Sequence, residues 1–193
     1  MTRMVCLASA VLLTASVASA QGQPAPPAAP AAAPLKLSLA AALQRNYGNV
    51  KMTLTQEAEK MPEDQFGFKP TPDVRAFGQL FGHVANSQFN ACSAAKGVPN
   101  PNQGNDNEKK TTKAEFAKAL ADSFAFCDEA FAALTDETAM QLVKQGQNEV
   151  ARGAVLAGLI AHSNEIYGTG VVYLRLKGIV PPSTERAQQM RRQ

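Results

Sequence analysis

Proline positions constrain this fold more than any other feature of the sequence, because proline breaks the interior of a helix or a central strand. Five of the 12 prolines lie between Gln21 and Pro34. The others fall into short clusters, at Pro62, Pro70, Pro72, Pro99, Pro101, Pro181 and Pro182. The long stretches between these clusters contain no proline, so helices can form there.

Four segments carry apolar residues at helical spacing, and we expect them to be the helices of the fold. They run over about residues 38–61, 74–96, 113–134 and 150–177. Ser38 is a candidate N-cap of the first segment, and Thr112 with Glu115 resembles a capping box before the third. No segment shows sustained alternation of apolar and polar residues. The sequence therefore predicts an all-α protein with the architecture of a four-helix bundle.

Both ends of the chain are expected to lie outside this bundle. Residues 1–20 start with Thr2 and Arg3, continue as an apolar run and end in Ala18-Ser19-Ala20, which is typical of a cleaved export signal. Residues 21–36 are expected to form a Pro/Ala-rich linker, and residues 184–193 a flexible basic tail. The protein is therefore expected in the periplasm or outside the cell. No later apolar run reaches about 20 residues, so no membrane insertion is expected.

The net charge of +3 is concentrated at the chain ends. Arg3 lies near the first residue, and Arg186, Arg191 and Arg192 lie near the last. The folded part is therefore close to neutral and has no basic face that could follow a phosphate backbone. The sequence predicts no nucleic-acid partner.

The cysteines bear on the topology. Once the first 20 residues are removed, Cys92 and Cys127 remain, and an oxidising compartment favours a disulfide between such a pair. If the second and third helices are parallel, the positions of these two residues along the helix axis differ by roughly 6 Å. If the two helices are antiparallel, the positions differ by roughly 15 Å. A disulfide spans a Cα separation of about 4.4–6.8 Å. A disulfide would therefore imply an up-down-down-up bundle, in which residues 98–111 carry the chain back along the helices. Two buried, reduced cysteines are the alternative.

The chain has only two histidines, His83 and His162, each in a predicted helix. The face of the helix around His83 is unusually polar and is expected to line a water-filled groove. It comprises Gln79, Leu80, Asn86, Ser87 and Asn90. Cys92 lies about 180° around the helix from His83. This pattern does not favour a Cys/His zinc site or a Cys–His nucleophilic pair.

Three smaller features favour structural roles. Gly168 and Gly170 predict a notch for close packing of the last helix against a neighbour. Lys109-Lys110 is expected to be a solvated pair. Asp128-Glu129 is expected to lie on a solvated helix face, because adjacent residues on a helix point in different directions.

Three segments together resemble the DinB-like superfamily, especially its exported bacterial members. They are FKPTPDVR at 68–75, FGQLFGHVAN at 77–86 and HSNEIYGTGVVYLRLKGIVPPS at 162–183. The resemblance covers about residues 37–183, which are expected to form the domain. It implies an up-down-down-up four-helix bundle with a divalent metal held by one histidine of the second helix and an H-x-x-x-H pair of the last. It also implies thiol-dependent transferase or isomerase chemistry in some members, whereas many members have no known activity.

Carried over to this sequence, the ligand positions are His83, His162 and Ile166. An isoleucine cannot bind a metal, so only two of the three ligands are present. Glu165 is the nearest candidate for a substitute third ligand, and Asn86 is a weaker one. A divalent ion such as Zn²⁺, Ni²⁺ or Fe²⁺ is therefore expected to bind weakly or not at all. The alternative is a vestigial groove in which two neutral histidines bind water and neighbouring amides.

Two classes of function follow from this pattern. The first is an exported DinB-like protein whose degenerate two-histidine groove belongs to a binding or stress-associated module. The second is a metal-dependent transferase or hydrolase that uses His83, His162 and a substitute third ligand. The residues alone leave open whether the protein is an enzyme. A small-molecule ligand suits such a groove, and the sequence is compatible with a homodimer.

Overall fold

The computed structural model describes residues 35–192, and from Lys36 onward they form one compact unit. The predicted export signal and residues 21–34 of the predicted linker lie outside the described residues. The elements are α1 (Leu39–Lys60), η1 (Glu63–Gln65), α2 (Phe77–Lys96), η2 (Asn107–Lys109), α3 (Lys113–Ala132), α4 (Asp136–Ala139), β1 (Leu142–Gln145), β2 (Asn148–Ala151), α5 (Arg152–Leu176) and α6 (Pro182–Met190).

The four long helices α1, α2, α3 and α5 confirm the four helices predicted from the sequence. The hydroxyl of Ser38 caps α1 by accepting from the backbone N–H of Ala41, and Thr112 with Glu115 forms a capping box on α3. Helix α2 begins at Phe77, later than predicted. The reason is that Phe77 N–H donates to the carbonyl of Phe68 and Gly78 N–H to that of Phe66, so the preceding residues form a loop.

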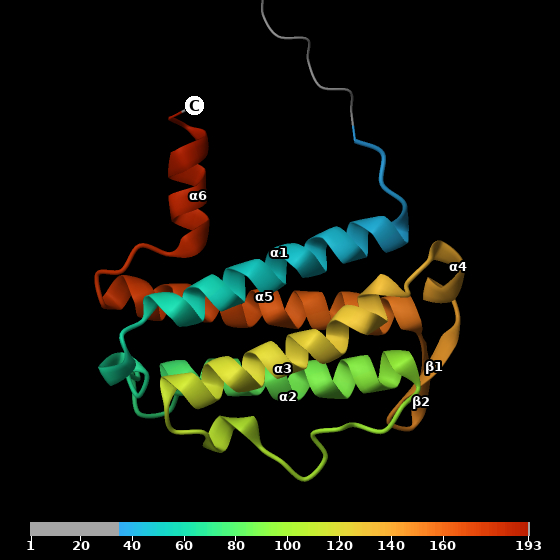
Figure 1. Ribbon diagram of the computed structural model, residues 1–193, viewed down its shortest axis with the longest axis horizontal. Coiled ribbons are helices and arrows are strands. Elements are labelled where there is room, and N and C mark those ends of the chain that lie inside the picture. The colour runs from blue at the N-terminus through green and yellow to red at the C-terminus, as the bar shows by residue number, and fades with distance from the viewer. Residues whose placement is uncertain (1–34, 193) are drawn as a thin grey trace, which may run out of the picture. The chain divides into compact units, whose positions relative to one another are not determined.

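The bundle has up-down-down-up topology (Figure 1). Helices α2 and α3 run in the same direction, and α1 and α5 run together in the opposite one. Phe66, before α2, stacks on Phe116 in the first turn of α3, with ring centroids 6.2 Å apart. Near the other end of the two helices, Cys92 and Cys127 form a disulfide with a Cα separation of 5.4 Å. The loop between α2 and α3 therefore carries the chain back along the bundle, as predicted.

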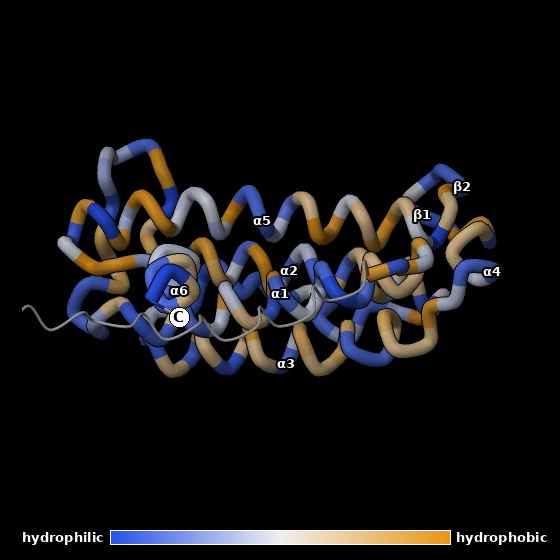
Figure 2. Tube along the Cα trace, turned by 90° about the horizontal axis from the view of Figure 1, so that it is seen from above, coloured by the Kyte–Doolittle hydropathy of each residue, from blue (hydrophilic) through white to orange (hydrophobic). Residues whose placement is uncertain are grey.

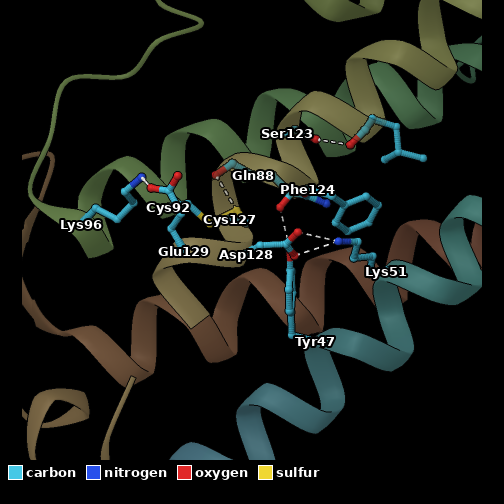
Figure 3. Close-up of a disulfide and its surroundings, with 11 residues drawn as sticks. Tyr47, Lys51, Gln88, Cys92, Lys96, Ser123, Phe124, Cys127, Asp128 and Glu129 are labelled. Carbon is cyan, nitrogen blue, oxygen red and sulfur yellow. Dashed lines mark hydrogen bonds and ion pairs between the residues drawn. A yellow bond between two sulfur atoms is a disulfide. The ribbon is translucent and has the colours of Figure 1, made fainter. Parts of the chain in front are cut away.

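The disulfide lies inside the core, where both cysteines have no exposed surface (Figure 3). Asp128, the next residue after Cys127, points from α3 toward α1. Its carboxylate accepts from Tyr47 Oη at 2.8 Å and from Lys51 Nζ at 2.6 Å. Asp128 thus ties α3 to α1. Its neighbour Glu129 is 70% exposed, yet its carboxylate accepts from Nζ of Lys96 on α2, so both members of the predicted solvated pair contact a neighbouring helix.

Two parts of the chain differ from the prediction. A short antiparallel hairpin pairs Leu142 with Ala151 and Gln145 with Asn148, around a turn in which Gly146 has φ 62°. Strands of four residues are too short to show a clear alternation in sequence. Residues 184–190, expected to belong to a flexible tail, lie in helix α6, which Lys60 and Gln56 of α1 hold through Glu185 and Arg186.

Apolar and polar residues are interspersed along each long helix, as the hydropathy colouring shows (Figure 2). The apolar side chains meet in one core, whose largest fully buried members include Phe77, Phe81, Phe124, Leu54 and Met61. No helix within residues 35–192 is long and apolar enough to cross a membrane.

One acidic side chain lies within this core. Glu57 of α1 is 1% exposed, and its Oε1 atom has no hydrogen-bond partner. A Cβ atom on Gly170 of α5 would lie only 2.6 Å from Oε1 of Glu57. The predicted glycine notch therefore exists at Gly170, and it makes room for a carboxyl group. Burial raises the pKa of Glu57 to about 9, so this group is protonated at neutral pH.

Candidate functional site

The two histidines lie next to each other between α2 and α5. The rings of His83 and His162 meet edge to face, with centroids 4.9 Å apart. Their side chains are 24% and 31% exposed, so solvent reaches both. The two helices pack against each other along their length, which brings residues almost 80 positions apart in sequence to one place. The structure thus brings together the two histidines that the sequence singled out.

His83 is held by a carboxylate that the sequence analysis missed. Its Nδ1 atom lies 2.7 Å from Oε1 of Glu108, which belongs to the η2 turn in the long loop. Glu108 also accepts from the guanidinium of Arg75, at 2.8 Å from Nε and 3.3 Å from Nη2. Burial alone would raise the pKa of Glu108, but the hydrogen bonds from Arg75 and His83 outweigh it and hold this pKa below its usual range.

The η2 turn can reach His83 because of two residues on α2. A Cβ atom on Gly82 would collide with the backbone carbonyl of Asn107, so a glycine is needed where the loop crosses the helix. One turn later, Oδ1 of Asn86 accepts from the backbone N–H of Asn107 at 3.1 Å and from its side-chain amide at 3.0 Å. Asn86 also donates to Asp106 at 2.9 Å. Asn86, a candidate ligand in the sequence analysis, is therefore occupied in positioning the loop.

His162 has different neighbours. Its Nε2 atom lies 3.1 Å from the hydroxyl oxygen of Ser87 on α2. Its Nδ1 atom lies 3.7 Å from Oε2 of Glu165, too far for a good hydrogen bond. Burial and the nearby His83 lower the pKa of His162. The imidazole of His162 is therefore neutral at pH 7 and can accept a proton or a hydrogen bond.

The donors around these histidines do not form the three-ligand set of a metal centre. Ile166 is 7% exposed and packs in the core, so its position offers no donor atom. Glu165 is 75% exposed and its Oε2 atom stays 3.7 Å from the nearer histidine nitrogen, and the carboxylate of Glu108 is paired with Arg75. Within residues 35–192, no three His, Cys, Asp or Glu side chains are grouped so that they could hold one ion. The residues present do not fit the three-ligand centre that the sequence resemblance implies.

A groove of about 750 Å³ opens beside the histidines, between α2, α5 and the loop before α2. Its floor is apolar, with Leu80, Ile166 and Tyr173. Its walls are charged and of mixed sign: Lys69, Asp73 and Arg75 come from the loop before α2, Glu108 from the η2 turn and Glu165 from α5. The groove has the size of a small-molecule site. Of the polar face around His83, Gln79 and Leu80 line this groove, whereas Asn86 and Asn90 line a separate recess beside the long loop.

Glu108 was hidden from the sequence analysis because nothing in its local pattern distinguishes it. It lies in a polar loop beside two lysines, 25 residues from the histidine that it contacts. Gly82 and Asn86 on α2 are the only local signs that a loop crosses the helix there, and they do not say which part of the loop does so. Arg75 lies in one of the segments that resemble a known family, but its partner Glu108 comes from the loop between α2 and α3, which lies outside those segments.

Comparisons with known proteins agree with this architecture. The model of a family described as the DinB superfamily matches residues 46–165. Among solved structures, a DinB-like protein from Bacillus cereus is 15% identical, with a TM-score of 0.62 over 72% of this chain and 93% of that one. A DinB-like protein from Bacillus subtilis is 18% identical, with a TM-score of 0.57 over 71% of this chain and 92% of that one. At these identities the likeness shows the fold alone. No curated protein is similar enough in sequence to count as a relative.

Proposed function

Because the chain belongs to the DinB superfamily, we propose that it is an exported binding module of that family. Its groove beside His83 and His162 takes a small polar ligand. The N-terminal sequence pattern supports export to the periplasm or the medium. N-terminal sequencing of the secreted protein tests the export: the mature chain is expected to start at Gln21, and an unprocessed chain retained in the cytoplasm would contradict it.

The observation that carries this proposal is the network from Arg75 through Glu108 to His83. Each link is a charged or polar contact within the protein, at 2.8 Å and 2.7 Å. Such a network holds its members in one geometry before any ligand arrives, which reduces the entropy lost on binding. The groove beside it supplies the space for a ligand. This combination supports a recognition site.

The same network supports weak metal binding at most. Two imidazoles without a third ligand bind Zn²⁺, Ni²⁺ or Fe²⁺ weakly. Ile166 supplies no donor, and the nearest carboxylate, Glu108, is neutralised by Arg75. We therefore expect purified protein to lose any divalent ion on dialysis against chelator, with no change in its free energy of unfolding.

One observation favours the alternative of a metal-dependent transferase or hydrolase. Metal-binding histidines usually donate their second ring N–H to a carboxylate. The carboxylate of Glu108 accepts such a hydrogen bond from Nδ1 of His83. Nε2 of His83 is then free to bind. In this alternative His83 and His162 are ligands and Glu165 completes the set.

Metal analysis separates the two functions. We expect the native protein, His83→Ala and His162→Ala to contain the same, substoichiometric amount of metal. A stoichiometric ion in the native protein that either substitution removes would favour the enzyme. The Ile166→His variant is the positive control, because it restores the missing donor and should then bind zinc tightly.

A further inference from the structure

We propose that the chain fills a carboxylate site of this groove with its own Glu108, and that the ligand of the groove is a small carboxylic acid whose carboxylate takes that place on Arg75 and His83. This inference rests on the proposed binding function and names its ligand class. It is drawn from the contacts that hold the Glu108 carboxylate, from the separate contacts that hold its loop, and from the groove beside it.

Arg75 and His83 surround the carboxylate of Glu108 with three nitrogen atoms. Its Oε2 atom accepts from Nε of Arg75 at 2.8 Å. Its Oε1 atom accepts from Nη2 of Arg75 at 3.3 Å and lies 2.7 Å from Nδ1 of His83. An ionised carboxylate can only accept, so Nδ1 carries the proton of this contact. A guanidinium that binds both oxygens of one carboxylate is a preferred arrangement for recognising this group, and His83 adds a third donor to it.

The backbones of the two donors are held without Glu108. His83 lies within α2, which packs against α3 and α5. The backbone carbonyl of Arg75 accepts from the hydroxyl of Tyr173 at 2.8 Å, and Tyr173 is only 3% exposed. A carboxylate that replaces Glu108 therefore meets donors that stay in place.

The loop also stays in place when the carboxylate of Glu108 leaves. Asn107, the preceding residue, is 5% exposed and donates to Asn86 through its backbone N–H and its side-chain amide. The backbone N–H of Glu108 donates to Oδ1 of Asp106 at 3.0 Å. These bonds do not use the Glu108 carboxylate, and its side chain is 24% exposed. The side chain can therefore turn into solvent by rotation about its own bonds, while the η2 turn keeps its position.

The charges in the groove favour an exchange of carboxylates over the simple addition of an anion. Lys69 and Arg75 line the groove together with Asp73 and Glu108, so the two loops contribute no net charge to it. An acid that takes the place of Glu108 leaves Arg75 paired, and the displaced carboxylate becomes solvated. Glu165 of α5 is 75% exposed, so its charge is solvated as well. The site thus admits one carboxylate at a time.

The floor of the groove selects for an apolar chain on that acid. Leu80, Ile166 and Tyr173 are each less than 10% exposed and line the same groove as Arg75 and Glu108. A short aliphatic chain attached to the carboxylate can cover these side chains, and its burial favours binding. The ligand class is therefore a small monocarboxylic acid with an apolar chain, of which butyrate is a simple example.

Glu108 competes with this ligand from within the chain. It follows directly after the anchored Asn107, so its effective concentration at Arg75 is on the order of millimolar or higher. The native protein should therefore bind free acids weakly. Removal of the Glu108 carboxylate should expose the site.

The test compares sodium butyrate with butyramide, which has the same length but no charge. Each is titrated into the full mature chain and into its Glu108→Ala variant, with chelator present and at constant ionic strength. Binding is followed by the amide chemical shifts of the isotope-labelled protein. We expect the variant to bind butyrate at least about tenfold more tightly than the native protein does, and at least about tenfold more tightly than it binds butyramide. Saturating butyrate should also raise the thermal unfolding midpoint of the variant toward that of the native protein.

Further variants locate the binding site. Adding Arg75→Gln to Glu108→Ala should abolish the preference for butyrate over butyramide, because the guanidinium is lost. Glu149→Ala removes a carboxylate from the exposed hairpin, at the other end of the bundle, and should bind butyrate as weakly as the native protein (Figure 1). Glu108→Gln keeps the size of the side chain and provides the same comparison if Glu108→Ala does not fold.

Equal affinity of the native protein and the variant for butyrate would overturn this inference, and so would equal affinity of the variant for butyrate and butyramide. The absence of saturable shifts in the variant would overturn it too. These results would leave the proposed binding function intact, because the groove could still take an uncharged ligand. A tightly bound metal, measured separately, would overturn the proposed function itself.

Discussion

Glu108 accepts a hydrogen bond from Nδ1 of His83 at 2.7 Å, and this contact joins the long loop to α2 in the middle of the bundle. The loop is thus part of the site as well as the connection that makes α2 and α3 parallel. Its position depends on Gly82 and Asn86, which lie on either side of His83.

Glu108→Gln should destabilise the protein by about 1–2 kcal/mol at pH 7, because it removes a charged partner from both His83 and Arg75. The pKa of Glu108 is lowered in the folded state, so its contribution is present above its ordinary value of 4.5 and is lost as the pH falls through the lowered value. Urea unfolding of the two proteins from pH 7 downward should show the difference closing. A difference that stays constant with pH would contradict this role, and Glu149→Gln is the matched surface control.

Glu57→Gln should stabilise the protein increasingly as the pH rises. The folded state keeps Glu57 protonated up to about pH 9, whereas the unfolded chain releases this proton near 4.5. The wild-type free energy of unfolding therefore falls between these two values, and a glutamine removes that loss. Urea unfolding at pH 5, 7 and 9 should give a gain that reaches a few kcal/mol at pH 9. Parallel pH profiles for the two proteins would show that Glu57 is ionised in the fold.

Gly170→Ala should destabilise the bundle by about 1–3 kcal/mol, because its methyl group would meet the buried carboxyl group of Glu57. Gly168→Ala is the matched control on the same helix. A Cβ atom there meets nothing within 4 Å, and alanine favours helix over glycine by about 1 kcal/mol. Thermal unfolding should therefore move the two midpoints in opposite directions. Equal shifts would mean that α5 does not approach α1 closely at Gly170.

The disulfide is expected to stabilise the protein by about 2–5 kcal/mol. The double variant Cys92→Ala, Cys127→Ala should unfold at a correspondingly lower urea concentration, and reductant should have no further effect on it. The unmodified mature protein, denatured without reductant, should react with no thiol reagent. Two reactive thiols in that experiment would show that Cys92 and Cys127 are reduced.

The helices of the bundle could be predicted because helical periodicity and proline breaks are local properties. The cap at Ser38 and the capping box at Thr112 lie within a few residues of the groups that they bind. The hairpin and α6 could not be predicted in this way, because their sequences are too short to show a clear local pattern. They are stabilised instead by contacts with other elements, such as the pairs that Lys60 and Gln56 make with α6.

The sequence by itself determined that four helices form and that paired cysteines require parallel α2 and α3, and both follow from the spacing of residues along a helix. That His83 and His162 lie together was implied by the resemblance to the DinB-like superfamily. Only the tertiary structure decided that Glu108 and Arg75 complete the site and that Glu57 lies protonated beside Gly170. These contacts depend on where a loop crosses a helix and on how closely two helices approach, and such distances are set by the packing of the whole bundle.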